Sequence, residues 1–307
     1  MNNLDPQALE CLAAIVEEGG FERAAQRLNI TQSAVSQRLR ALEAQAGTVL
    51  VVRSRPLRAT SAGQLFIKHT KMLRLLRADL EREWRDIAPG HEGSGREDEG
   101  VSVAINADSI ATWALPALDS LARSGAPVEI ITDDQAFTQD WLRQGQVMGC
   151  VTSMNQALRG CRMVALGSMD YIAVASAEYV QRYLPNGLTA HNFHRQPFVA
   201  HNRKDDIPRD FVAHAFGISA PTVRRVFTPS SNAQVRATQA GWGLAVLPRL
   251  LVQGLVDSGE LVHLQPSYSH WVNLYWHCWN LDSAVLTNLS TSLGDAARLS
   301  LRAPSKT

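Results

Sequence analysis

Apolar residues spaced three and four positions apart predict a helix at the start of the chain. Its apolar stripe consists of Leu9, Leu12, Ala13 and Val16. Asp5 is expected to cap this helix, and Pro6 suits the first helical position, where the backbone N–H has no partner inside the helix. Gly19 and Gly20 are expected to end it, because glycine readily adopts the conformation that follows a helix.

Two further short helices follow, separated by a tight turn at Asn29 and Ile30. Thr31 is expected to cap the second of them. The apolar stripes are Phe21, Ala24, Ala25 and Leu28 on the first and Val35, Leu39, Leu42 and Ala46 on the second. The opposite side of the second carries polar side chains, namely Ser33, Ser36, Gln37 and Arg40. This is the helix-turn-helix arrangement, whose second helix enters the DNA major groove, where glutamine suits adenine and arginine suits guanine. An ordinary helical hairpin with a polar face is the alternative.

A basic hairpin is predicted next, in LVVRSRPLRAT (Leu50–Thr60). A short strand, a turn with proline and a return strand would bring arginines to the DNA phosphates, and a basic surface loop is the alternative. We therefore expect DNA contacts from Thr31, Gln32, Ser33, Ser36, Gln37, Arg40, Arg53, Arg55 and Arg58. The charge pattern favours DNA, because eleven Lys or Arg lie between Arg23 and Arg77 against Glu43 alone, although the whole chain carries only +1.

A long helix is predicted from Thr60 or Ser61 to Ala88, where Pro89 and Gly90 end it. Its seam positions alternate in steps of three and four and are Phe66, His69, Leu73, Leu76, Leu80 and Ile87. A seam of this kind favours pairing with a second copy of the helix, and packing within its own domain is the alternative. The stretch HEGSGREDEG at 91–100 has no apolar side chain and is expected to form a flexible linker.

After residue 100, short apolar runs alternate with helical patterns, as in a doubly wound α/β region. We expect a helix over about 109–123, another around 137–143 and a last one from about Ala284, with MVALG and YIAVAS as separate strands. The length of 307 residues, 45% hydrophobic and 19% charged, indicates a soluble globular chain of two or three domains. With no secretory signal, no run of transmembrane length and no C-x-x-C pair, a reduced cytoplasmic location is expected.

The motifs of common enzyme classes are missing from the sequence. There is no G-x-S-x-G elbow, P-loop or H-E-x-x-H motif. His191 and His194 lie three positions apart without a matching carboxylate or cysteine pattern, and Cys278 lies in an apolar run where it is expected to pack. We therefore expect no catalytic residues, no metal site and no cofactor. A transport binding protein is a further class, which the basic N-terminal segment and the missing signal oppose.

Several segments resemble the LysR-type transcriptional regulators, and the resemblance covers essentially the whole chain. They are RAAQRLNITQSAVSQRLRALE (Arg23–Glu43), TSAG (Thr60–Gly63) and GWGLAVLP (Gly241–Pro248). Within that family, three more resemble the ArgP/LysG branch, the regulators of lysine and arginine export that are also described as similar to inhibitors of chromosome initiation. They are NADSIATWALPAL (Asn106–Leu118), TDDQ (Thr132–Gln135) and LYWH (Leu274–His277). The arginine-rich RSRPLR of the hairpin departs from the milder loop of the family.

The resemblance implies an α/β protein with four parts. These are a winged helix-turn-helix over 1–59, a dimerising linker helix over 60–90, the flexible linker over 91–100 and an effector domain over 101–307. The effector domain would have two lobes like a periplasmic binding protein, lobe I at about 101–160 and 271–307 and lobe II at about 161–270.

The resemblance also implies partners and a function. The implied partners are double-stranded DNA and further copies of the chain, in a homodimer or homotetramer. RNA polymerase is a candidate partner, and no membrane is implied as a partner. The implied function is to control a promoter for basic amino-acid export or metabolism in response to lysine or arginine. A different small effector and an architectural role at DNA or a replication origin stay open, as do the operator and the direction of regulation.

Acidic residues follow two strands of the predicted sheet and mark a place for the effector. VSVAIN leads into Asp108 and Ser109, and VEIIT leads to Asp133 and Asp134. Such folds bind ligands at the carboxyl ends of their strands, and a cationic side chain that leaves water needs a carboxylate. Helix capping is the alternative role for Asp108 and Ser109. The other candidates are Thr152 and Ser153 on the same lobe and His201, Ser230 and Ser231 on the opposing lobe.

Overall fold

The computed structural model describes residues 4–52, 54, 57–87, 100–123, 125 and 127–303, apart from the side chains of 85 and 86. Arg53, Arg55 and positions 91–99 of the expected linker lie outside these ranges. The described helices are α1 (Pro6–Glu17), α2 (Phe21–Leu28), α3 (Gln32–Ala46), α4 (Ser61–Ile87), α5 (Ala107–Thr112), η1 (Leu115–Leu118), α6 (Asp119–Arg123), α7 (Thr138–Arg143), α8 (Ala177–Tyr183), η2 (Phe193–Arg195), α9 (Ile207–Phe216), α10 (Ser231–Gln239), α11 (Arg249–Asp257) and α12 (Ala284–Ser300). The described strands are β1 (Val51–Val52), β2 (Arg58–Ala59), β3 (Val101–Ala104), β4 (Val128–Ile131), β5 (Gly149–Thr152), β6 (Cys161–Ser176), β7 (Pro197–Ala200), β8 (Arg224–Phe227), β9 (Leu244–Pro248), β10 (Leu261–His263) and β11 (His270–Trp279).

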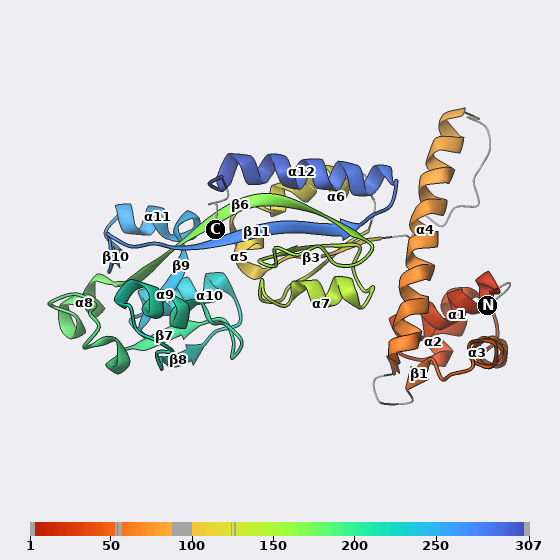
Figure 1. The fold of residues 1–307 in the computed structure, drawn as a ribbon, viewed down its shortest axis with the longest axis horizontal. Coiled ribbons are helices and arrows are strands. Elements are labelled where there is room, and N and C mark those ends of the chain that lie inside the picture. The colour runs from red at the N-terminus through yellow and green to blue at the C-terminus, as the bar shows by residue number, and fades with distance from the viewer. Residues whose placement is uncertain are drawn as a thin grey trace.

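The N-terminal unit packs α1, α2 and α3 around one apolar core, with the β1–β2 hairpin beside them (Figure 1). The Asp5 side chain accepts the N–H of Gln7 at 2.9 Å, and Thr31 accepts that of Ala34 at 3.2 Å, so both predicted caps are confirmed. Asn29 takes the left-handed conformation, with φ 53°, and makes the tight turn between α2 and α3. The helix-turn-helix predicted from apolar spacing is therefore present.

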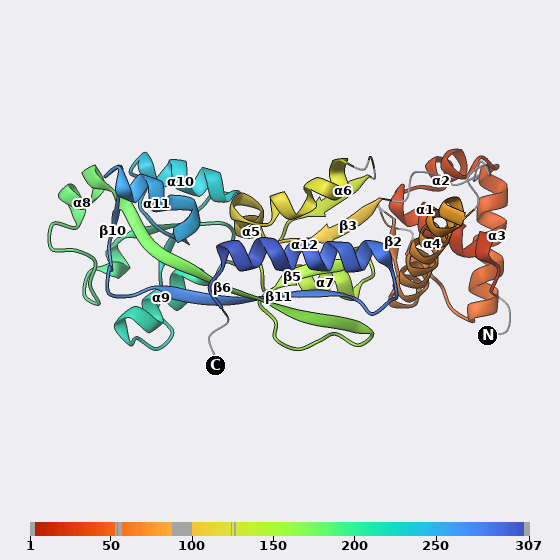
Figure 2. The same ribbon diagram turned by 90° about the horizontal axis from the view of Figure 1, so that it is seen from above.

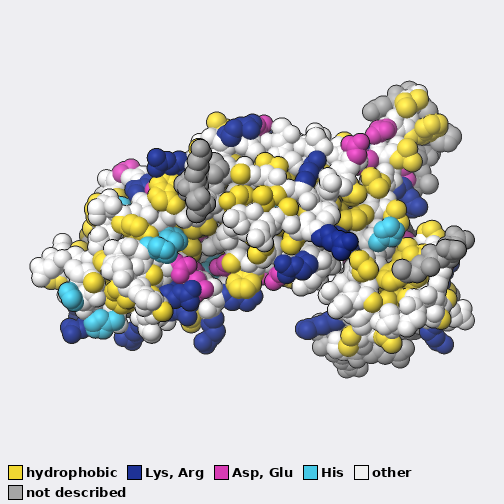
Figure 3. Space-filling model, in the orientation of Figure 1, with side chains coloured by type: hydrophobic (Ala, Val, Ile, Leu, Met, Phe, Trp, Pro, Cys, Tyr) yellow, Lys and Arg dark blue, Asp and Glu magenta, His cyan; other side chains and the backbone are white. Residues whose placement is uncertain are grey.

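The long helix α4 connects the N-terminal unit to the C-terminal domain, residues 101–303, and packs against both (Figures 1 and 2). Ile67 lies in the core of the N-terminal unit, and Leu75 lies in the core of the C-terminal domain. Four of the predicted seam positions are exposed, namely Leu73, Leu76, Leu80 and Ile87. Figure 3 shows apolar side chains along the free end of this helix. The helix thus has packed faces and one apolar face open to solvent.

One nine-stranded sheet runs through the C-terminal domain in the order β4-β3-β5-β11-β6-β9-β7-β8, with β10 paired to β6. Strands β3, β4 and β5 are parallel to one another, as are β7, β8 and β9. The long strands β6 and β11 pair antiparallel and join the two groups. We call the half with β3, β4 and β5 lobe I and the half with β7, β8 and β9 lobe II. In Figure 1, α12 lies on one face of lobe I and α7 on the other.

Two elements differ from the sequence prediction. MVALG and YIAVAS belong to one 16-residue strand, β6, because it crosses from one lobe to the other beside β11. A glycine interrupts the apolar pattern there without ending the strand: Gly167 has φ 142°. The helix expected over 109–123 is divided into α5, η1 and α6, because Trp113 leaves helical geometry and Pro116 lacks the N–H that a continuous helix needs.

Candidate effector pocket and DNA-binding surface

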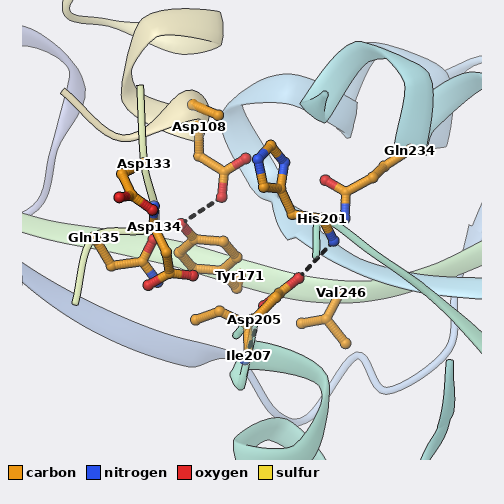
Figure 4. Close-up of a pocket in the computed structure, with 11 residues that line it drawn as sticks. Asp108, Asp133, Asp134, Gln135, Tyr171, His201, Asp205, Ile207, Gln234 and Val246 are labelled. Carbon is orange, nitrogen blue, oxygen red and sulfur yellow. Dashed lines mark hydrogen bonds between the residues drawn. The ribbon is translucent and has the colours of Figure 1, made fainter. Parts of the chain in front are cut away.

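A pocket lies where the two lobes meet, next to the carboxyl ends of β3, β4 and β7. It is lined by Ala107, Asp108, Asp133, Asp134, Gln135, Tyr171, His201, Asp205, Ile207, Gln234 and Val246. Its empty volume is about 360 Å³, part of which is open solvent. In Figure 4, Asp108 approaches from one side and Asp134 and Asp205 from the other. The two lobes therefore supply carboxylates to the same space.

Asp108 joins the lobes through both oxygens of its carboxylate. Tyr171 of β6 donates to Oδ2 at 2.8 Å, and Ser231 at the start of α10 donates to Oδ1 at 2.7 Å. Burial raises the pKa of Asp108, while these two hydroxyl donors and the nearby His201 oppose the rise. Burial, together with the charge of Asp108, also raises the pKa of Tyr171. Asp108 is thus engaged within the protein before any ligand arrives.

Asp133 and Asp134 lie in the loop after β4. Asp133 accepts the Asp134 N–H at 2.9 Å through Oδ1 and the Trp141 indole N–H at 3.1 Å through Oδ2. Asp134 accepts the N–H of Ala136 at 2.9 Å through Oδ1. Burial raises the pKa of Asp134 to about 6, and neighbouring carboxylates, Asp205 foremost, add to the rise, which the Ala136 N–H opposes. A bound cation would therefore relieve the repulsion that Asp134 experiences from its neighbours.

Asp205 reaches the pocket from lobe II. Its oxygens accept the backbone N–H of His201 at 2.8 Å and of Ile207 at 3.1 Å, which fixes the loop between β7 and α9. Burial raises the pKa of Asp205 foremost; the His201 N–H opposes the rise and the charge of Asp108 adds to it. Asp205 is buried and His201 is half-buried.

The described residues that line the pocket include four carboxylates and one histidine, and neither lysine nor arginine is among them. Figure 3 shows a few acidic side chains near the middle of the C-terminal domain, with Lys or Arg and His side chains beside them. Like charges crowded out of water disfavour one another, and a cation among them relieves that repulsion through charge-assisted hydrogen bonds. The arrangement suits a small ligand that carries positive charge.

Four of the sequence candidates line the pocket directly: Asp108, Asp133, Asp134 and His201. Thr152 and Ser153 do not line it but hold its wall, since their hydroxyls donate to the carbonyl of Gln135 at 2.9 and 3.4 Å. Thr152 ends β5 and Ser153 follows it, at the predicted edge of the sheet, and their hydroxyls hold the neighbouring loop in place.

The three serines lie near the boundary of α5 and α10 rather than on the pocket wall. Ser109 is buried, and among the described residues its hydroxyl has no hydrogen-bond partner. Ser230 caps α10 by accepting the N–H of Ala233 at 3.3 Å. Ser231 reaches the site only through Asp108.

Polar side chains that the sequence prediction missed complete the lining: Gln135, Tyr171, Asp205 and Gln234. Gln135 belongs to the segment TDDQ and Asp205 follows the strand that ends at Ala200, so polar groups after a strand were a usable signal for both. Tyr171 begins the apolar run YIAVAS and reads as a core residue.

The predicted DNA contacts of α3 lie on its open side. Gln32, Ser33, Gln37 and Arg40 are exposed, and Ser36 is half-buried. The cap Thr31 and Arg58 of β2, on the same unit, are also exposed. The opposite side of α3 is buried through Val35, Leu39 and Leu42. Figure 2 shows α3 at the end of the molecule farthest from lobe II, where nothing in the drawn chain covers its outer side.

Part of the basic charge in this region stabilises the fold. Arg74 of α4 donates to Glu10 at 2.9 Å and to Glu17 at 3.1 Å, and Lys71 lies 4.0 Å from Glu17. Arg27 of α2 also pairs with Glu17, at 2.6 Å. Glutamates of α1, which lie before Arg23, therefore neutralise several of the eleven cations between Arg23 and Arg77. The positive surface is smaller than that count of cations indicates.

Two family descriptions match consecutive parts of the chain. "Bacterial regulatory helix-turn-helix protein, lysR family" matches residues 6–64, and "LysR substrate binding domain" matches residues 94–289. The chain belongs to the LysR-type transcriptional regulators. As a member of that family it is a DNA-binding regulator with a domain for a small molecule, and its relatives are regulators rather than enzymes.

Individual relatives agree with the branch assigned from the sequence. The "HTH-type transcriptional regulator ArgP" of Klebsiella pneumoniae is 39% identical over 305 residues, which covers 98% of this chain and 99% of the relative. A solved structure of ArgP from Mycobacterium tuberculosis has 36% identity and a TM-score of 0.83, covering 98% of this chain and 100% of its own. LysG from Corynebacterium glutamicum "with bound effector Arg" has 31% identity and a TM-score of 0.73, covering 97% and 100%. The resemblance to the ArgP/LysG branch is confirmed.

In the part of the chain that the structure describes, no helix has the length and apolar character needed to cross a membrane. The same residues contain no group of three or more His, Cys, Asp or Glu side chains placed to hold a metal ion.

Proposed function

We propose that the protein senses a basic amino acid, lysine or arginine, in the pocket between the lobes and controls a promoter for basic amino-acid export or metabolism in response. The observation that carries this proposal is the pocket lining, with four carboxylates and, among the described residues, no lysine or arginine. The LysG structure with bound effector Arg supports it, because that protein matches this chain over 97% of its length.

The side-chain cation of the ligand is expected to bind Asp134 foremost, with Asp133 and Asp205 beside it. Both oxygens of Asp108, of Asp133 and of Asp205 already accept protons from protein donors. Asp134, in contrast, has a carboxylate whose neighbours repel it, and a guanidinium or ammonium replaces that repulsion with charge-assisted hydrogen bonds. The amide side chains of the lining supply neutral donors for the α-carboxylate of an amino acid.

The protein is proposed to act in the cytoplasm as a homodimer or homotetramer on double-stranded DNA, with RNA polymerase as a further partner. The support for an oligomer is the open apolar face of α4, on which Leu73, Leu76 and Leu80 are 44%, 40% and 62% exposed. An apolar stripe of this kind on a long helix favours a second helix across it. Two joined N-terminal units would present two α3 helices to two half-sites of DNA.

Isothermal titration with matched ligands tests the sensing proposal. Citrulline has the shape of arginine without its charge, and norleucine has that of lysine without its ammonium group. A hydrogen bond to a charged group contributes about 1.5–3 kcal/mol, so each neutral ligand should bind about 10- to 150-fold more weakly than its cationic counterpart. Binding of citrulline as tight as that of arginine, or no binding of either basic amino acid, would contradict the proposal.

A further inference from the structure

One turn of lobe I packs against the helix that carries the DNA-binding unit. This turn, residues 144–146, follows α7, and Gly145 has φ +71°. A Cβ at Gly145 would lie 2.4 Å from the Cβ of Lys68 and 2.8 Å from its Cα, so only glycine fits against α4 here. The Nζ of Lys71, one turn further along α4, donates to the carbonyl of Gln146 at 2.9 Å.

Lys71 lies between two acceptors that belong to different domains. Its Nζ is 2.9 Å from the Gln146 carbonyl of lobe I and 4.0 Å from Oε1 of Glu17 in α1. Glu17 is also held by Arg74 of α4, so a change at this carboxylate reaches the ion pairs that fix α1 on α4. A half-buried ammonium placed between one acceptor in each domain can move toward Glu17 when the Gln146 carbonyl moves away.

Within α7, Trp141 contacts the lining of the pocket. Its indole N–H donates to Oδ2 of Asp133 at 3.1 Å, and its carbonyl accepts the N–H of Gln146 at 2.9 Å. One residue of α7 therefore contacts both a carboxylate of the pocket lining and the residue whose carbonyl binds Lys71. The described contacts form a continuous series from Asp133 to Glu17 with only Trp141, Gln146 and Lys71 between them.

We propose that α7 and the turn after it transmit effector occupancy from the pocket to the DNA-binding unit, with Trp141 and Lys71 as the positioning residues. This inference rests on the proposed function, because it needs a cation at Asp133. A bound cation competes for the lone pairs of that carboxylate and draws it away from the indole N–H, and a hydrogen bond weakens steeply when its geometry changes. Because α7 is short and internally hydrogen-bonded, its displacement moves the turn and changes the acceptor available to Lys71.

The test compares the arginine Kd of the full-length protein with and without saturating DNA, using a duplex that the parent protein selects from a random pool. Allosteric coupling is reciprocal, so DNA must change the arginine Kd by the factor by which arginine changes DNA affinity, expected to be at least about fivefold in the parent. In Lys71→Met and in Trp141→Phe, the ratio of the arginine Kd with DNA to that without DNA should be close to one. Lys71→Met should leave the arginine Kd of the DNA-free protein within about threefold of the parent, because Lys71 does not line the pocket.

Matched controls separate coupling from loss of charge or of an indole. Arg77→Met removes a cation from an exposed position of α4, and Trp242→Phe removes an indole that is 55% exposed; both should keep the parental ratio. A parental ratio in Lys71→Met and Trp141→Phe would overturn the inference, as would a parent whose arginine Kd is the same with and without DNA. A parent that binds neither arginine nor lysine would overturn the proposed function and remove this inference with it.

Discussion

Effector binding should depend on pH through Asp134. Burial and neighbouring carboxylates raise the pKa of this group to about 6, above its ordinary value of 3.8, so the free protein takes up a proton as the pH falls through 6. Protonation removes the charge that a cationic effector needs. About a tenth of these carboxyls are ionised at pH 5 and nearly all at pH 7.5, which predicts about tenfold weaker binding at pH 5. Raised pKa values at Asp108 and Asp205 act in the same direction.

Titration calorimetry of arginine at several pH values measures this dependence. At pH 6 the parent should release about half a proton per ligand, detected as a dependence of the heat on the ionisation enthalpy of the buffer. Asp134→Asn should bind more weakly at pH 7.5 and lose most of the dependence between pH 5 and 7.5. The reasoning is refuted if the parent binds equally well at pH 5 and pH 7.5, or if the Asn variant keeps the parental slope.

The same substitution should stabilise the ligand-free protein at neutral pH. A carboxyl whose pKa is raised on folding binds a proton more tightly in the folded state than in the unfolded state. The free energy of unfolding therefore falls as the pH rises from about 4 to 6, and the full loss is present above pH 6. The cost is about 1–3 kcal/mol for a half-buried group, after allowing for screening by solvent. Asp134→Asn should therefore raise the melting temperature at pH 7.5 while it lowers the affinity for arginine, and an unchanged or lower melting temperature would contradict the repulsion inferred for this pocket.

Two predictions concern DNA binding and assembly. Gln37→Ala should abolish sequence preference in footprinting and leave binding that weakens steeply with salt, because arginines on the same unit still meet phosphates; a footprint like that of the parent would move recognition away from this face of α3. Replacing Leu76 and Leu80 together with Glu places charges on the open face of α4 and should give a smaller species in sedimentation, with weaker operator binding; an unchanged assembly would locate the interface elsewhere.

Features set by neighbouring residues were predictable from the sequence. The caps at Asp5 and Thr31 depend on contacts two or three residues away, and the structure has both. The three acids at the ends of β3 and β4 were predictable as a group, because parallel strands bring their carboxyl ends to one edge, although the pattern did not show that Asp108 is committed to hydroxyl donors.

Features set by distant segments were not predictable in the same way. Asp205 comes after β7, but its surroundings in the sequence, NRKDDIPRD, are those of a solvated loop, and its place beside Asp108 and Asp134 depends on how the two lobes meet. Tyr171 sits in an apolar run, and its polar role follows only from the approach of Asp108 across the sheet. The length of β6 likewise depends on β11, which comes about a hundred residues later in the chain.

The order of the strands has a consequence during synthesis. Strand β11 lies between β5 and β6 in the sheet, and α12 follows it near the end of the chain, so lobe I is completed last although it begins first. A ribosome that adds about 5–20 residues per second needs on the order of 10–40 s to extend the nascent chain from Val101 to Ser300. The N-terminal unit, whose core is complete at Ile67, has emerged long before. Every new molecule therefore passes through a period in which it has its DNA-reading helix but no finished receptor for the effector.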